Sequence, residues 1–261
     1  MWIVGLVLLG VAAFCAFQAR SQARRVAQME ATESKTVAEL DSLAETINDE
    51  LGAGQFYFPA EVNGTVVCDL PLKTELAGLD AVHYSMSVVR HYEHRVETTN
   101  AEGRRESRMV QSSEGVASNS RSVPFWVEDQ TGSIRVNPEG AEWVTEKVLS
   151  RYEQGSRGSS FGGFRLSSSS WGSGNGRTLG YRYEEEAVPV GRRVYILGVA
   201  ADSPEGIQMR KPDKDGRLII SVKSEDVLKE QKQSSVAILW IVAGVSAIIG
   251  VYCLFAGLTS G

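Results

Sequence analysis

Histidine and cysteine are scarce in this chain of 261 residues, which contains three of each. Cys15 and Cys253 fall in long apolar runs, so only Cys68 belongs to the polar part of the chain, and an intradomain disulfide is excluded. The sequence contains no Walker A motif. Its net charge of −5 gives no support to general nucleic-acid binding, which normally requires a basic excess.

The three histidines are of the residue type that binds metals, and His83, His91 and His94 lie close in sequence to Cys68 and Glu93. However, positions 91 and 94 differ by an odd number and would point to opposite faces of a regular strand. We therefore predict no metal site and no bound cofactor, and we interpret the histidines as exposed residues at strand ends.

Two sequence patterns resemble catalytic motifs but lack the required surroundings. Residues 158–162 match G-x-S-x-G, yet a nucleophile elbow needs a preceding strand, a following helix and a downstream histidine, and no histidine follows His94. The acidic run at 184–186 is typical of a solvated strand face or a guarded sheet edge. We predict no catalytic residue.

Two uncharged apolar runs, residues 2–17 and 236–258, stand near the ends of the sequence. Their length favours transmembrane helices over residues 1–20 and 236–258. A cleaved signal peptide is the alternative for the first run, but Arg20, Arg24 and Arg25 follow it, whereas a signal peptide carries its charge in front. Basic flanks stay on the cytoplasmic side, so we predict an integral membrane protein with two spans and a cytoplasmic central domain, expected in a bacterial inner membrane.

Between the two runs the periodicity changes from helical to strand-like. Residues 21–54 predict a juxtamembrane amphipathic helix, and residues 223–235 predict a linker helix. The β domain spans residues 55–222, with turns at 129–132, 190–191 and 213–216, and we also expect a helix at 140–154. Its predicted strands are residues 61–68, 82–90, 122–128, 133–136, 181–187, 192–200 and 217–222. The fold class is mainly β (α+β), with an OB-like barrel between the two transmembrane helices.

Residues 155–180 form a low-complexity loop without any acidic residue, and residues 98–119 predict a hairpin extension. We predict that the low-complexity loop is a contact surface, formed by Arg157, Phe161, Phe164, Arg165, Trp171 and Arg177. Arginines interleaved with aromatic rings suit anionic lipid headgroups; single-stranded nucleic acid and a disordered insertion without function are the alternatives. Small residues at Ala243, Ser246, Ala247 and Gly250 make a homo-oligomer another candidate.

A series of motifs recurs along the chain in a characteristic order. They are residues 32–40 (Thr-Glu-Ser-Lys-Thr-Val-Ala-Glu-Leu), Val62-x-Gly64-x-Val66, Pro71-Leu72 with Leu76 and Gly78, Tyr84, Val123-Pro-Phe125 through Glu128-Asp129-x-x-Gly132 to Val136-x-Pro138-x-Gly140-Ala141, and Glu185 through Gly191 to Val194-Tyr195-x-Leu197-Gly198. Together they resemble the GIDE family, also called the BAM (beside-a-membrane) domain. This family is best known from mitochondrial and chloroplast-envelope membrane ubiquitin ligases.

The resemblance implies a ligase ancestry, but a zinc RING needs roughly eight Cys and His ligands, which this sequence cannot supply. The chain therefore looks like the RING-less prokaryotic branch. We expect a membrane-anchored, non-catalytic sensor or adaptor that binds a protein or a small ligand. An enzyme of ubiquitin-like transfer or of another hydrolytic reaction is one alternative, and a membrane scaffold or assembly factor is the other.

Overall fold

The protein is described by a computed structural model that covers residues 7, 10–18, 20, 34–52, 54–99, 103–155, 160–161, 164–165, 176–213, 216–223, 242–247 and 249–250. The chain divides into two compact units. Unit 1 comprises Met1–Ser34, Pro59–Glu61 and Lys223–Gly261, and unit 2 comprises Lys35–Phe58 and Val62–Val222. Unit 1 contains helical residues at 10–18 and 242–247 and a parallel β-bridge between Ser34 and Glu61.

The two transmembrane helices predicted over residues 1–20 and 236–258 are not supported. No helix within the described part of the chain is long and apolar enough to cross a membrane. The prediction of an integral membrane protein with two spans and a cytoplasmic domain is therefore wrong. Residues 224–235, where we expected a linker helix, lie outside the described residues.

Helix α2 (Val37–Leu51) lies within the segment 21–54 for which we predicted an amphipathic helix, and residues 21–33 lie outside the described residues. It begins at a capping box in which Thr36 and Glu39 satisfy each other's backbone amides. Two further amides of its first turn donate to side chains of the turn at residues 129–132. Val37 N donates to Asp129 Oδ2 at 2.9 Å, and Ala38 N donates to Thr131 Oγ1 at 3.1 Å. Its buried face consists of Val37, Leu40 and Ala44.

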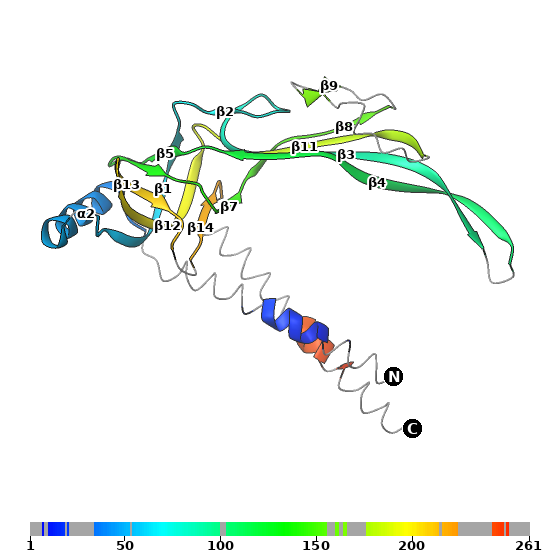
Figure 1. The fold of residues 1–261 in the computed structure, drawn as a ribbon, viewed down its shortest axis with the longest axis horizontal. Coiled ribbons are helices and arrows are strands. Elements are labelled where there is room, and N and C mark those ends of the chain that lie inside the picture. The colour runs from blue at the N-terminus through cyan, green and yellow to red at the C-terminus, as the bar shows by residue number, and fades with distance from the viewer. Residues whose placement is uncertain are drawn as a thin grey trace. The chain divides into compact units, whose positions relative to one another are not determined.

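Unit 2 contains a five-stranded barrel, and Figure 1 labels four of its strands, β1, β5, β12 and β13. The ring order is β1-β5-β6-β13-β12, and it closes because β12 also pairs with β1. Most of the described ladders are antiparallel, but β6 and β13 run parallel. The strands are β1 (Tyr57–Val67), β5 (Phe125–Glu128), β6 (Ser133–Val136), β12 (Arg193–Ser203) and β13 (Gly206–Arg210). β14 (Leu218–Ser221) extends the sheet from β12, and β7 (Ala141–Val144) pairs parallel with β14.

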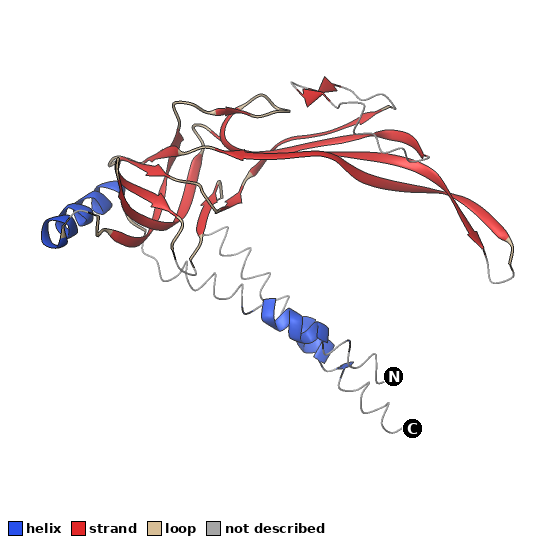
Figure 2. Ribbon diagram, in the orientation of Figure 1, coloured by secondary structure: helices blue, strands red, loops and turns tan. Residues whose placement is uncertain are grey.

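A second sheet, which is fully antiparallel, contains the long strands of unit 2 that extend away from the barrel (Figure 2). β3 lies between β11 on one side and β4 and β2 on the other, and β8 pairs with the far side of β11. The strands are β2 (Leu72–Lys73), β3 (Asp80–Thr99), β4 (Arg105–Ser122), β8 (Glu146–Gln154) and β11 (Gly176–Pro189). The side chains of one face form a buried apolar cluster that includes Tyr84, Met86, Val88, Tyr181 and Tyr183. The predicted hairpin extension is confirmed as the β3–β4 ribbon.

The helix predicted over 140–154 is wrong, because the segment forms β7 and β8. Trp143 pairs with Ile220 of β14, and Leu149 pairs with Glu185 of β11. Pairing with neighbours distant in sequence outweighs the local helical spacing of Val144, Val148 and Leu149. Within the low-complexity loop, β9 (Ser160–Phe161) and β10 (Phe164–Arg165) form a short antiparallel pair.

Candidate functional site

A pocket of about 380 Å³ opens on the wall of the barrel. Its lining comes from three places: the segments that leave β1 and enter β5, the strands β5 and β6 themselves, and the turn between β12 and β13. The lining residues are Cys68, Asp69, Leu70, Val123, Pro124, Phe125, Trp126, Arg135 and Glu205. Residues that are far apart in the sequence thus meet at one surface of unit 2.

Strand register explains why this surface faces outward. Trp126 lies opposite Val67 on β1 and opposite Arg135 on β6, and Arg135 in turn lies opposite Gln208 on β13. Their neighbours in each strand, such as Val66 and Val127, are fully buried inside the barrel. Because successive side chains alternate between the two faces of a strand, the row that contains Trp126 must lie on the outer wall.

Apolar side chains dominate the accessible part of the pocket. Trp126 is half-buried, whereas Leu70 is 86% exposed, and Val67 beside Trp126 is 38% exposed. Large apolar side chains clustered on a surface around a hollow are typical of interaction sites. Cys68 contributes a half-buried thiol that lies 3.8 Å from the carbonyl oxygen of Pro124.

Charge at the pocket is carried by three side chains. Arg135 forms an ion pair with Glu205, so its positive charge is compensated within the pocket wall. The Arg135 side chain is 28% exposed and that of Glu205 is 62% exposed. Asp69 is exposed at the rim. The lining therefore holds two carboxylates and one guanidinium.

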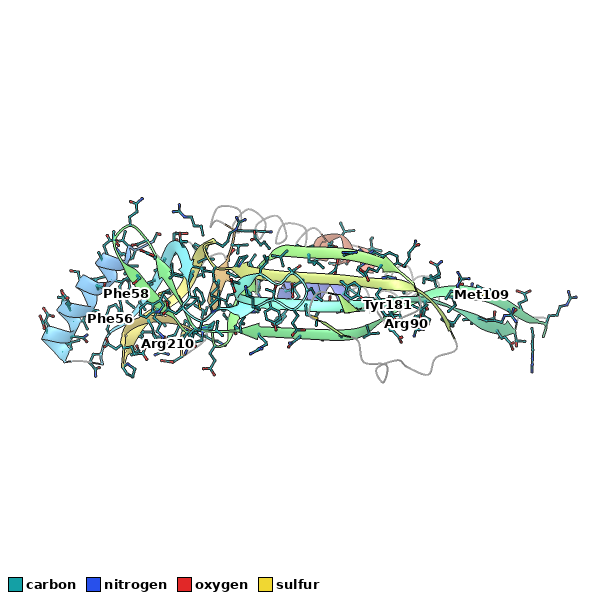
Figure 3. All side chains as sticks on the ribbon, turned by 90° about the horizontal axis from the view of Figure 1, so that it is seen from above. Phe56, Phe58, Arg90, Met109, Tyr181 and Arg210 are labelled. Carbon is teal, nitrogen blue, oxygen red and sulfur yellow. The ribbon has the colours of Figure 1, made fainter. Side chains whose placement is uncertain are left out.

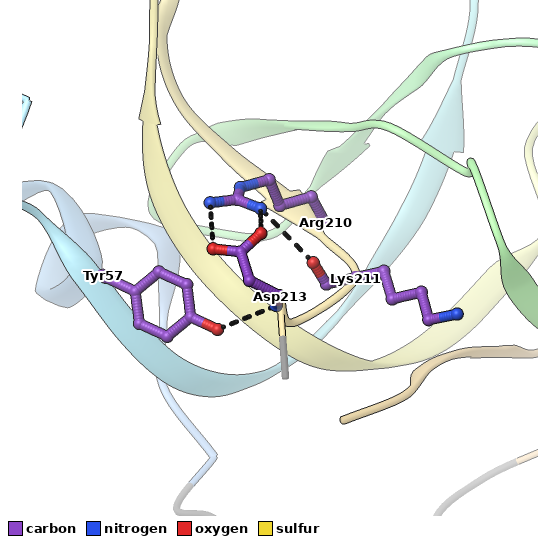
Figure 4. A network of polar contacts seen from close by, with 4 residues as sticks. All are labelled: Tyr57, Arg210, Lys211 and Asp213. Atoms are coloured by element: carbon purple, nitrogen blue, oxygen red, sulfur yellow. Dashed lines mark hydrogen bonds and ion pairs between the residues drawn. The ribbon is translucent and has the colours of Figure 1, made fainter. Parts of the chain in front are cut away.

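A separate polar cluster fixes the chain after β13 (Figure 4). Arg210 donates to both carboxylate oxygens of Asp213, at 2.5 and 3.2 Å, and its guanidinium lies 5.6 Å from the centre of the Tyr57 ring. The Asp213 amide donates to the Tyr57 hydroxyl at 3.2 Å. These contacts are internal to the cluster and hold the end of β13 against β1.

The second sheet buries a cation at one end of its apolar face, where Figure 3 shows Arg90 beside Tyr181. Arg90 donates to Glu114 and to Thr178 Oγ1, both at 2.8 Å, and its guanidinium lies 4.9 Å from the centre of the Tyr92 ring. Burial raises the pKa of Tyr181, and the positive charge of Arg90 opposes that rise. The charge of Arg90 is therefore compensated by Glu114, and its other contacts, to Thr178 and Tyr92, lie within the same sheet.

The acidic run at 184–186 is only partly the solvated face that we predicted. Glu184 accepts hydrogen bonds from the side chains of Lys147 and Ser150, and Glu186 accepts one from the Thr145 hydroxyl. Glu185 is fully buried, and its two oxygens accept hydrogen bonds from the amides of Leu76, at 3.1 Å, and Ala77, at 2.7 Å. β11 is also a central strand, so it guards no edge.

The histidines do not share one environment. His91 and His94 are half-buried, with ring contacts to Tyr152 and Tyr92 respectively. His83 is 7% exposed, which contradicts the prediction of exposed histidines, and stacks on Trp143 with ring centroids 4.1 Å apart. Among the described residues, no group of three or more His, Cys, Asp or Glu side chains is placed to hold a metal ion.

Stability should depend on pH through His83. Burial lowers the pKa of His83 to about 4, from 6.5 in its unperturbed state, although a hydrogen bond with the Arg121 backbone opposes the shift. The unfolded chain therefore takes up a proton first as the pH falls. The stabilisation by neutral His83 is complete above pH 6.5 and is lost as the pH falls toward about 4.

Lowering the pH from 7 to 5 should cost about 2 kcal/mol of unfolding free energy through this group, measured by urea denaturation. A His83→Phe variant keeps a ring against Trp143 but does not titrate, and should lose that part of the pH dependence. An identical pH dependence in both proteins would contradict the assignment to His83.

The predicted contact loop is only partly within the described residues. Arg157 and Trp171 lie outside them, Phe161 belongs to β9, and Phe164 and Arg165 form β10. Arg177, at the start of β11, lies 3.5 Å from Glu93 and is 78% exposed. The contact role of this loop, with anionic lipid as its candidate partner, stays a prediction.

The model of the GIDE family, described as E3 ubiquitin ligase, matches residues 93–256, which is more than half of the chain. The chain therefore belongs to the GIDE family, as the sequence motifs indicated. Comparison with curated proteins and with solved structures finds no match.

Proposed function

We propose that the GIDE-family barrel of this protein is a non-catalytic binding module that recruits its ligand at the outer-wall pocket around Trp126. The observation that carries the proposal is the composition of the pocket: an accessible tryptophan and an exposed leucine in a hollow on the barrel wall. Ligand sites are typically concave and mostly apolar, with few polar groups that orient the ligand.

The strand order supports this choice of surface. In chain order the barrel strands are β1, β5, β6, β12 and β13, and around the ring they read first, second, third, fifth, fourth. We interpret this as an OB-like arrangement. OB-folds bind ligands on the face of their second and third strands and on the loops between strands one and two and strands four and five.

The pocket residues map onto that surface without exception. Phe125 and Trp126 belong to the second barrel strand and Arg135 to the third. Cys68, Asp69 and Leu70 begin the long connection between the first two strands, Val123 and Pro124 end it, and Glu205 lies in the turn between the last two. Analogy with OB-folds therefore supports this surface as the ligand site, and the chemistry of the lining has to identify the ligand.

The chemistry of the lining supports binding rather than catalysis. A nucleophile needs a base within hydrogen-bond reach. Cys68 is the one thiol or hydroxyl group among the lining side chains, and its hydrogen-bond contact is the carbonyl oxygen of Pro124 rather than a carboxylate or a histidine. Arg135 is occupied by Glu205.

The proposal can be tested by fluorine NMR on the full chain labelled with 5-fluorotryptophan, in which a Trp126→Phe variant assigns one of the five tryptophan resonances. The probes are short acetylated, amidated peptides of basic, acidic and neutral composition, a thymidine oligonucleotide and a maltose oligosaccharide. We expect at least one probe to shift the Trp126 resonance and to be recovered chemically unchanged.

Leu70→Ser should weaken that binding about tenfold, because it removes an exposed apolar contact without disturbing the core. Leu79→Ser, at another exposed leucine, is the matched control and should bind normally. The proposal fails if no probe moves the resonance, or if a bound probe is chemically converted.

A further inference from the structure

We infer that the pocket around Trp126 selects a cationic, apolar peptide segment of a partner protein, in which a lysine or arginine side chain flanks an apolar side chain. This inference rests on the proposed function, because it names the ligand of the same site. Its basis is the combination of an aromatic surface, an exposed leucine and an excess of negative charge in one lining.

The charge of the lining favours a cation. Glu205 neutralises Arg135 by direct pairing, and Asp69 at the rim remains as uncompensated negative charge among the lining residues. Because Asp69 and Trp126 line the same pocket, a bound cation has both a carboxylate and an aromatic ring available to it. Lysine and arginine are attracted both to carboxylates and to the face of an indole, the strongest aromatic partner for a cation.

The apolar part of the lining favours a side chain beside that cation. Leu70, which lines the pocket, is 86% exposed, and Val67, which pairs with Trp126, is 38% exposed. Their burial is favourable by roughly 25 cal/mol per Å² of apolar surface removed from water. A purely ionic ligand would leave this apolar surface exposed to water, whereas an apolar residue next to a lysine would bury it.

Nucleic acid, the ligand of many OB-folds, is disfavoured by the same charges. A bound strand needs cations that neutralise its phosphates, and the single guanidinium of this lining is already paired. Asp69 and Glu205 would in addition repel phosphate groups. The net charge of the chain, −5, acts in the same direction.

The test compares matched peptides on the fluorotryptophan-labelled full chain. Gly-Lys-Leu-Lys-Gly should shift the Trp126 resonance and bind at least tenfold more tightly than Gly-Glu-Leu-Glu-Gly, and more tightly than Gly-Lys-Ala-Lys-Gly. Asp69→Asn should weaken binding of the lysine-leucine peptide several-fold and reduce its salt dependence, since an exposed carboxylate at the rim is lost. Glu139→Gln, at an exposed carboxylate outside the lining, is the control and should leave binding unchanged.

The outcomes separate the two proposals. If the acidic peptide, the oligonucleotide or the oligosaccharide binds at Trp126 as tightly as the lysine-leucine peptide, the binding site stands and the ligand class inferred here is wrong. Binding that Asp69→Asn leaves unaltered also contradicts the inference. If no probe moves the Trp126 resonance, the proposed function itself has failed.

Discussion

Replacing Glu185 by alanine should lower the free energy of unfolding by about 3 to 4 kcal/mol. The carboxylate is fully buried and accepts hydrogen bonds from the amides of Leu76 and Ala77. Without it, the buried amide of Leu76 and the half-buried amide of Ala77 lose their partner, and a buried donor left unsatisfied costs roughly 1–3 kcal/mol. Urea denaturation of the full chain, followed by circular dichroism, measures the change.

Two matched variants identify the cause of this loss. Glu184→Ala removes a neighbouring carboxylate that bonds to the exposed side chains of Lys147 and Ser150, and should cost less than about 1 kcal/mol. Glu185→Gln keeps one acceptor oxygen and should fall between the wild type and Glu185→Ala. If Glu184→Ala and Glu185→Ala are equally stable, the two amide hydrogen bonds do not hold the segment at 76–77 to β11.

Local patterns were sufficient to predict most strands of the barrel. The predicted strand at 133–136 is β6, the predicted turn at 129–132 joins β5 to β6, and the reversal at 190–191 joins β11 to β12. Short runs rich in β-branched and aromatic residues, bounded by Gly or Asp at the turns, carry this information. Gly191 has a φ of 80°, which explains the glycine at that turn.

The division of these strands between two sheets could not be predicted in the same way. β3 and β12 both read as alternating or apolar runs, yet one belongs to the second sheet and the other closes the barrel. Pairing partners depend on contacts between residues that are distant in the sequence. For the same reason Glu185 reads as one of three exposed acids, because its partners Leu76 and Ala77 lie more than 100 residues away.

The candidate site was missed by sequence reasoning for a physical reason. Its residues come from separate stretches around positions 68, 125, 135 and 205, and none of these stretches contains a known ligand motif. The one available signal was Trp126 between buried positions 125 and 127, which places a large aromatic side chain on the outer face of a strand. The position of Trp126 could be interpreted only with knowledge of which face of β5 packs against the core.

The close approach of β1 to β5 next to this site depends on Gly64. A Cβ at position 64 would lie 2.5 Å from Val127 Cγ1 and 2.6 Å from the Glu128 carbonyl oxygen, both well inside van der Waals contact. Gly64→Ala should therefore force the two strands apart and lower the free energy of unfolding by about 3 kcal/mol, at the upper end of the usual cost of overpacking. Because Val67 pairs with Trp126, the fluorine resonance of Trp126 should also move.

Gly115 of β4 offers the matched control, since a Cβ added there meets no atom within 4 Å. Both glycines lie within strands, so the change in intrinsic preference from glycine to alanine is similar at the two positions. Gly115→Ala should therefore be neutral or slightly stabilising, because alanine restricts the unfolded chain. If Gly64→Ala is as stable as Gly115→Ala and the Trp126 resonance keeps its position, the contact between Gly64 and β5 does not shape the pocket. If only Gly64→Ala loses stability and shifts that resonance, the spacing of β1 and β5 links barrel packing to the binding surface.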